Sequence, residues 1–249
     1  MFIREDNTQS SKTLILIHGQ VFDSRIWDDA VPSFDARVLR PDLPGHGQSS
    51  GDIVVEFERQ QERLEAVLLP LARGPVHLVG YSLGSYHALA LALQGRLEVA
   101  SLTMLGPWAG ADRSVLENFA MLASAAEEEQ LPWVDVFLGN CFSPTFAASH
   151  PATVALTRAR IKQGSAAALV AELRRFPRMV DLRPRVSELK MPVLLRVGDA
   201  DPTTTLASAQ ALMPELKKGT LQVAEGVAHH YLAQDPEGTV AAIRAFTGC

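Results

Sequence analysis

Short apolar runs rich in β-branched residues and leucine recur along the chain, separated by stretches with helical periodicity. The strand-like runs lie at 13–17, 37–40, 76–79, 100–105, 193–197 and 220–224. Continuous apolar runs are typical of strands that are buried on both faces of a parallel sheet. The helical stretches between them lie at 53–69, 85–93, 205–213 and 236–246. This alternation predicts an α/β protein with a mostly parallel central sheet and helices on both of its faces.

The alternation stops between residues 108 and 188, where helical patterns follow one another without a strand. These patterns cover 115–129, 133–142, 152–161 and 166–176, with Pro132, Pro144, Pro151 and Gly164 as breaks. A block inserted after the carboxyl end of a strand is expected to lie over that edge of the sheet. The sequence therefore predicts one folded unit, with a core domain at 1–107 and 189–249 and a helical lid insertion at 108–188.

The most informative stretch is Gly80-Tyr81-Ser82-Leu83-Gly84, which lies between an expected strand and an expected helix. A serine there must occupy a sharp turn, and the glycines on either side keep the neighbouring backbone from clashing. The turn lifts the hydroxyl to the edge of the sheet and directs free N–H groups at the start of the helix towards its target. This pattern predicts a nucleophile elbow, although a serine that only caps the helix would also fit these five residues.

Three further loops follow predicted strands, and they hold Gln20, Asp201 and His229. The carboxyl ends of parallel strands meet at one edge, so we expect these residues to converge with Ser82. A serine hydroxyl needs an imidazole base, and the imidazole needs an acid that orients it. The chain order of serine, acid and histidine satisfies that requirement. Asp199 and His230 are the alternative acid and base in the same two loops.

Five motifs in this order resemble those of α/β-hydrolase-fold enzymes, and among them small lidded carboxylesterases and enzymes like 3-oxoadipate enol-lactonase. The motifs span nearly the whole chain: HGQ at 18–20, DLPGHGQS at 42–49, GYSLG at 80–84, GDADP at 198–202 and GVAHHYLAQDP at 226–236. The sequence departs from the family in three places. Ser85 and Ala228 replace common glycines, and the first antiparallel strand is missing or reduced to a remnant at 2–4.

The resemblance implies specific roles for residues at the sheet edge. It implies Ser82 as nucleophile, His229 as base, Asp201 as orienting acid, and the backbone N–H groups of Gln20 and Leu83 as the oxyanion hole. The family places the acid directly before a proline, which favours Asp201 over Asp199. The spacing from the histidine to Pro236 likewise favours His229 over His230.

Composition narrows the possible functions. The 249 residues are 47% hydrophobic and 20% charged, a composition typical of a globular protein. The net charge of −5 gives no electrostatic basis for binding nucleic acid or an anionic membrane. Cys141 and Cys249 do not form a disulfide framework, and no histidine and carboxylate spacing predicts a metal. The first residues lack a signal-peptide pattern and no apolar run is long enough to span a membrane, so we expect a cytoplasmic protein without a cofactor.

The expected function is hydrolysis of a small-molecule ester or lactone through a Ser82 acyl-enzyme. A cofactor-free lyase, a thioesterase or a C–C bond hydrolase with the same three residues is an alternative, as is a noncatalytic ligand receptor on the same fold. Substrate choice is expected to lie in the lid. One or two lid arginines could turn inward and bind a substrate carboxylate: Arg113, Arg158, Arg160, Arg174, Arg175 and Arg178.

Overall fold

The computed structural model describes residues 1–49, 56–110, 113–127, 133–164 and 166–249. The first residues of the helix expected at 53–69, the end of that expected at 115–129 and the expected break at Pro132 lie outside these ranges. Within the described residues, one sheet has seven strands. They are β1 Ile3–Asp6, β2 Thr13–Ile17, β3 Arg37–Pro41, β4 Val76–Tyr81, β5 Val99–Leu105, β6 Val193–Gly198 and β7 Gly219–Ala224.

The strands follow the order β1-β3-β2-β4-β5-β6-β7. All neighbouring pairs are parallel except β1 and β3, which are antiparallel. The predicted strand remnant at 2–4 therefore forms a short edge strand. The mostly parallel sheet and the predicted fold class are confirmed.

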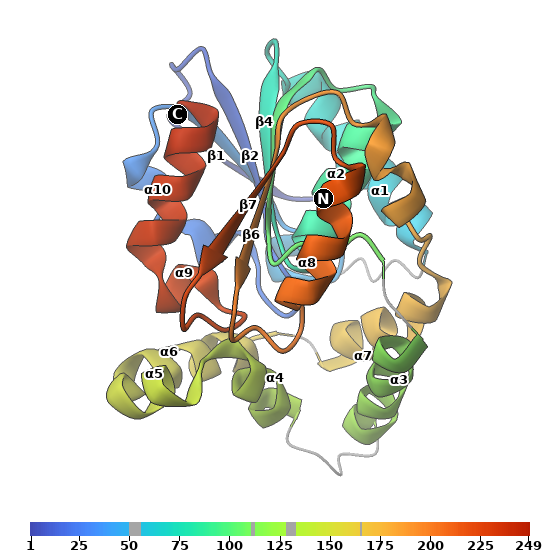
Figure 1. The fold of residues 1–249 in the computed structure, drawn as a ribbon, viewed down its shortest axis with the longest axis vertical. Coiled ribbons are helices and arrows are strands. Elements are labelled where there is room, and N and C mark those ends of the chain that lie inside the picture. The colour runs from blue at the N-terminus through green and yellow to red at the C-terminus, as the bar shows by residue number, and fades with distance from the viewer. Residues whose placement is uncertain (50–55, 111–112, 128–132, 165) are drawn as a thin grey trace.

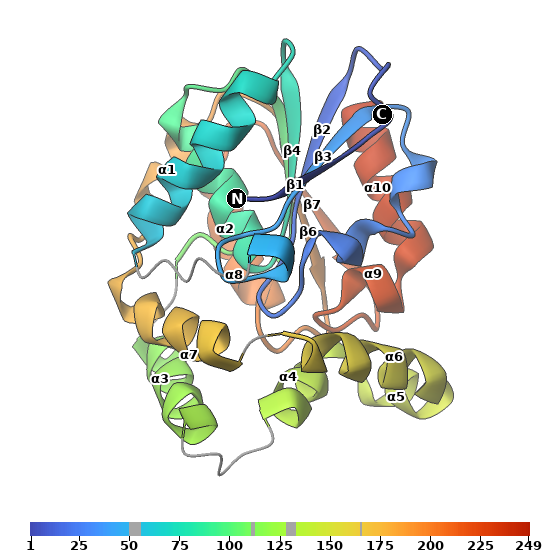
Figure 2. The same ribbon diagram turned by 180° about the vertical axis from the view of Figure 1, so that it is seen from behind.

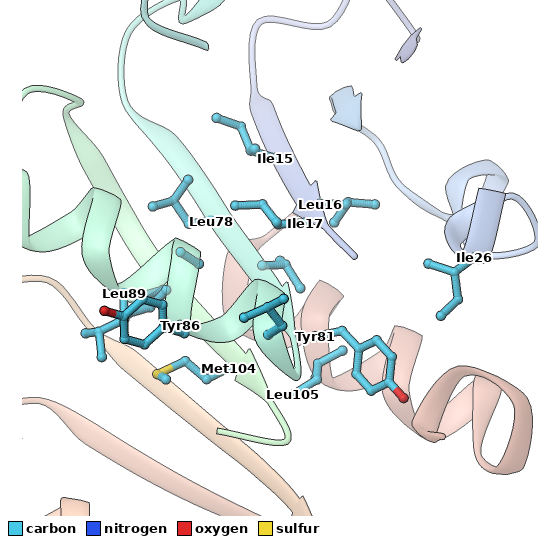
Figure 3. Close-up of a cluster of buried hydrophobic side chains, with 14 of the residues drawn as sticks. Ile15, Leu16, Ile17, Ile26, Leu78, Tyr81, Tyr86, Leu89, Met104 and Leu105 are labelled. Atoms are coloured by element: carbon cyan, nitrogen blue, oxygen red, sulfur yellow. The ribbon is translucent and has the colours of Figure 1, made fainter. Parts of the chain in front are cut away.

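Helices cover both faces of the sheet, as Figures 1 and 2 show. On one face lie α1 Phe57–Leu68, α2 Leu83–Gln94 and α8 Leu206–Leu212, and α10 Pro236–Thr247 lies on the other. Leu89 of α2 lies near Leu78 and Met104 of the sheet, whereas Leu16 and Ile26 lie on the opposite side (Figure 3). Strands β2 and β3 are buried along their whole length, which accounts for the apolar sequence of β2, whereas β3 also buries Arg37 and Arg40.

The chain between β5 and β6 carries helices that gather at the carboxyl ends of the strands (Figures 1 and 2). They are α3 Arg113–Glu127, α4 Trp133–Cys141, α5 Pro144–Ser149, α6 Pro151–Lys162 and α7 Ala166–Arg175. The sequence pattern predicts only a break at Pro144, so α5 is not expected from the sequence. A proline is well suited to the first helical turn, and Pro144 and Pro151 each begin a helix. Among the described residues, no helix has the length and apolarity needed to cross a bilayer.

Candidate active site

Ser82 lies in a strained turn between β4 and α2. Its backbone has φ 54° and ψ −118°, which few non-glycine residues adopt. A Cβ on Gly80 would lie 2.2 Å from the carbonyl oxygen of Gly84, and a Cβ on Gly84 would lie 2.3 Å from that of Ile17. Only glycine fits at both positions, so the elbow predicted from the sequence is present. The Ser82 hydroxyl makes no capping hydrogen bond to α2.

Ser85, which replaces a common glycine, helps to hold this turn. Its hydroxyl donates to the carbonyl of Ser82 at 2.6 Å and accepts from the N–H of Trp108 at 2.9 Å. The serine therefore links the elbow to the chain that leaves β5.

The structure brings the three predicted side chains together at the sheet edge. His229 Nε2 lies 2.8 Å from Ser82 Oγ, and its Nδ1 lies 2.8 Å from Asp201 Oδ2. Ser82 and His229 are each 9% exposed and Asp201 is 4% exposed. The arrangement supplies a hydroxyl, a base within reach of its proton and an acid that fixes the base.

Besides the contact with His229, Asp201 accepts hydrogen bonds from its own loop and from Tyr231. The N–H groups of Thr203 and Thr204 donate to Oδ1 at 2.8 and 2.9 Å, and the Thr204 hydroxyl donates to Oδ2 at 2.8 Å. The hydroxyl of Tyr231 donates to Oδ2 at 2.6 Å. Burial raises the pKa of Asp201, but the attraction of His229 and these hydrogen bonds outweigh burial and lower the pKa to about 2. Asp201 is therefore ionised throughout the neutral range.

The alternative acid and base lie elsewhere. Asp199 is exposed and accepts from the N–H of Gly226 at 2.7 Å. His230 is buried, with its ring packed against Phe22, Tyr81 and Phe142. Neither side chain contacts Ser82 or His229 through a hydrogen bond, so the geometry favours the pair chosen from the motif spacing.

The loop after β2 brings Gln20 close to the start of α2. Gly84 packs against the carbonyls of Ile17 and His18 so closely that a side chain would not fit. Leu83 is the first residue of α2, where N–H groups have no acceptor within the helix. These contacts place the two predicted oxyanion donors on neighbouring backbone segments.

His18 anchors that loop. Its Nε2 accepts from the N–H of Leu43 at 2.9 Å, and its Nδ1 donates to the carbonyl of Gly19 at 2.8 Å. Burial, together with the nearby His46, lowers the pKa of His18 to about 4. His18 is therefore neutral, and both of its nitrogens are used in holding the loop.

Sequence reasoning missed the contacts that support the histidine loop. The N–H groups of His229 and His230 donate to the carbonyls of Asn140 and Cys141, at 3.2 and 2.9 Å. Both acceptors lie at the carboxyl end of α4. No local sequence pattern could predict these hydrogen bonds, because the donors and acceptors lie far apart in the sequence. They come together only because α4 packs over the edge of the sheet.

The arginines considered as carboxylate ligands lie in different environments. Arg158 pairs with Asp135 and Arg174 pairs with Glu127, and all four side chains are substantially exposed. Arg175 is 3% exposed and lies 3.4 Å from Glu172. The remaining described arginines, Arg160 and Arg178, are exposed. The side chain of Arg113 lies outside what the structure describes.

In the described residues, no three His, Cys, Asp or Glu side chains cluster as a metal site.

Comparison with known proteins gives a family match over most of the chain. A family model described as the alpha/beta hydrolase family matches residues 14–242.

Individual relatives carry several activities in their names. A pimeloyl-acyl-carrier-protein methyl ester esterase from Edwardsiella ictaluri is 30% identical, over 94% of this chain and 93% of that protein. A 2-succinyl-6-hydroxy-2,4-cyclohexadiene-1-carboxylate synthase from Salmonella paratyphi C is 28% identical, over 92% and 90%. The solved enol-lactonase from Burkholderia xenovorans LB400 superposes with a TM-score of 0.88 at 18% identity, over 100% of this chain and 96% of that one. The last likeness concerns the fold alone.

Proposed function

The chain belongs to the alpha/beta hydrolase family, and from that premise we propose that it hydrolyses a small-molecule ester or lactone through an acyl-enzyme on Ser82. The observation that carries this proposal is the pair of 2.8 Å contacts that joins Ser82 to His229 and His229 to Asp201.

The proposed reaction has two halves. His229 Nε2 takes the hydroxyl proton as Ser82 Oγ attacks the carbonyl carbon, and the ionised Asp201 stabilises the resulting imidazolium. The N–H groups of Gln20 and Leu83 donate to the carbonyl oxygen as it gains negative charge. His229 then gives its proton to the departing alkoxide. A water molecule, deprotonated by His229, attacks the acyl carbon and releases the acid and Ser82 Oγ, which regains the proton.

We propose that residues 108–188 act as a lid that selects the substrate, over a core formed by 1–107 and 189–249. Its support is the position of α3–α7 at the edge of the sheet where Ser82 lies. Buried apolar residues of this segment pack into the hydrophobic core: Val134, Leu138, Phe142, Ile161, Leu169, Leu173 and Phe176.

A cofactor-free lyase that uses the same three residues is the second candidate. The relative named as a cyclohexadiene-carboxylate synthase supports it, at 28% identity over 92% of this chain. A lyase of this kind needs a base but not an acyl-enzyme. Trapping an acyl group on Ser82 therefore separates the two candidates.

The test is to compare the wild-type protein with Ser82→Ala on a short-chain aryl ester and with a fluorophosphonate probe. We expect the wild type to turn over the ester and to be labelled at Ser82. Ser82→Ala should fold normally, as circular dichroism would show, yet lose hydrolysis and labelling. Full activity in the variant would refute the nucleophile. A wild type that neither hydrolyses esters, lactones and thioesters nor reacts with the probe would instead indicate a receptor.

A further inference from the structure

A cavity of about 300 Å³ lies between α6 and the core, beside the candidate active site. One wall is formed by α6, another by residues 26–30, and a third by the segment from His230 to Val240. Its described lining does not include Ser82, Asp201 or His229. It is therefore a separate cavity from the triad.

His230 lines this cavity with hydrogen-bonding capacity that the protein does not use. The residue is 1% exposed, and neither ring nitrogen has a hydrogen-bond partner among the described residues. The rings of Phe22, Tyr81 and Phe142 pack around it, and the Tyr81 hydroxyl makes no hydrogen bond to either nitrogen. Burial, with the charges of His229 and Arg160, lowers the pKa of His230 to about 3, so the ring is neutral and keeps one N–H donor. Buried polar groups are nearly always paired, which points to a partner from outside the chain.

Arg160 lines the same cavity from α6. Arg160 and His230 thus line one cavity, and the positive charge of Arg160 contributes to lowering the pKa of His230. Arg158, on the same helix, is paired with Asp135, whereas in the described part of the chain Arg160 has no acidic partner within ion-pair distance. Asp29, the acid that lines this cavity, is exposed.

The rest of the lining is largely apolar. It includes Ile26, Ala30, Leu156, Leu232, Ala233 and Val240. Leu156 is 68% exposed, so part of this apolar surface faces solvent.

We propose that this cavity binds a small amphipathic carboxylate. Its anionic group accepts hydrogen bonds from Arg160 and from the His230 N–H, and its hydrocarbon body packs on Ile26, Leu156 and Val240. Charge complementarity selects this ligand class, because a guanidinium binds a carboxylate in a fork and a neutral imidazole adds a third donor. The site does not depend on any reaction at Ser82.

The experiment uses phenylacetate as the probe and 2-phenylethanol as its neutral counterpart. Calorimetric titrations are made with the wild type, Arg160→Gln, Leu156→Glu and His230→Phe, and with Arg158→Gln as the matched control. The protein carries Ser82→Ala in every case, so the result is independent of the proposed hydrolysis. We expect saturable phenylacetate binding that weakens about tenfold or more in Arg160→Gln and Leu156→Glu and is unchanged in Arg158→Gln. Contacts from the phenyl protons to the methyl groups of Ile26 and Val240, seen by NMR, should locate the ligand.

Three outcomes would overturn the proposal. They are the absence of saturable binding, equal binding of 2-phenylethanol, and equal affinity in Arg160→Gln and the wild type. If His230→Phe does not fold, Arg160→Gln and Leu156→Glu still decide, because both positions are exposed and tolerate a polar residue. Binding at the triad instead would appear as NMR contacts to Leu83 and not to Val240.

Discussion

Asp199 and Asp201 lie two residues apart in one loop but have opposite environments. Asp201 is buried against His229, whereas Asp199 is exposed and its carboxylate accepts from the N–H of Gly226. We expect Asp201→Asn to lower kcat on an aryl ester by roughly 10³- to 10⁴-fold, because the amide NH2 at the Oδ2 position would donate to Nδ1 and hold the wrong tautomer, and no negative charge would stabilise the imidazolium. Asp199→Asn should lose less than about tenfold, since it changes only a turn contact. A larger loss in Asp199→Asn would contradict the assignment.

Tyr231 is a positioning residue for the acid. Its hydroxyl donates to Asp201 at 2.6 Å and accepts from the N–H of Gly198 at 3.2 Å. In Tyr231→Phe the Asp201 carboxylate loses one donor, so its negative charge acts more strongly on His229 and favours the protonated imidazole. We therefore expect the acidic limb of kcat/KM to move to higher pH, by up to about one unit.

The pH profile separates this role from a structural one. Tyr86→Phe is the control, because the Tyr86 hydroxyl donates to the carbonyl of Val180, at 3.0 Å, and has no other hydrogen-bond partner in the part of the chain that the structure describes. Loss of activity in Tyr231→Phe without any shift of the acidic limb would show that the ring only packs.

Single residues of the site were predictable where a short motif fixes their place. The glycines around Ser82 and the proline after Asp201 determine where those side chains emerge, and the structure brings them together. Tyr231 was missed, because a tyrosine beside two histidines carries no signal that its hydroxyl reaches the acid. Hydrogen bonds of this kind depend on the three-dimensional path of the chain.

At the scale of elements, α4 is joined to the histidine loop through Gln234 of α9 Tyr231–Gln234. Its Oε1 accepts from the N–H groups of Ala228 and Ser143, at 3.1 and 3.3 Å. Its Nε2 donates to the Ser143 hydroxyl at 2.9 Å and to the carbonyl of Gly226 at 2.5 Å. One side chain thus ties the end of α4 to the backbone that carries His229.

Removing this link should misplace the base without removing any reacting group. We expect Gln234→Ala to lower kcat roughly ten- to hundredfold with little change in KM, because catalysis depends on the position of His229. Gln234→Glu keeps the acceptor and should recover part of the loss, and Ser143→Ala should cost less than Gln234→Ala. Steady-state kinetics on the aryl ester measure the split. An increase in KM alone would contradict a role in positioning the base.

Elements were predictable in proportion to their burial and length. The predicted limits of β2, 13–17, agree with the structure, and β6 extends the predicted 193–197 by one residue. The short helices α5 and α9 were missed because their six and four residues do not complete two helical turns, over which an apolar pattern would repeat. The pairing of β1 with β3 is a long-range contact that only the folded sheet defines.

At the scale of the whole molecule, the layers enclose three histidines with strongly lowered pKa values. Burial is the main cause for His18, whose pKa falls to about 4, and for His87 and His230, whose values fall to about 3. All three are at most 1% exposed. The sequence could not show this, because burial of a histidine depends on which helices cover it.

These buried histidines should make the protein sensitive to acid. A histidine in the unfolded chain has a pKa near 6.5. Between that pH and the lower pKa values of the folded protein, the unfolded state therefore binds protons that the folded state does not bind. The free energy of unfolding therefore has its full value above about pH 6.5 and falls as the pH is lowered. For three histidines the fall is at most about 4 kcal/mol per pH unit. Denaturant unfolding between pH 7 and pH 4 measures this slope. His87→Asn should reduce it by about a third, since one of three proton-binding groups is removed. A stability that stayed constant over this range, or rose on acidification, would show that these side chains are not held neutral inside the fold.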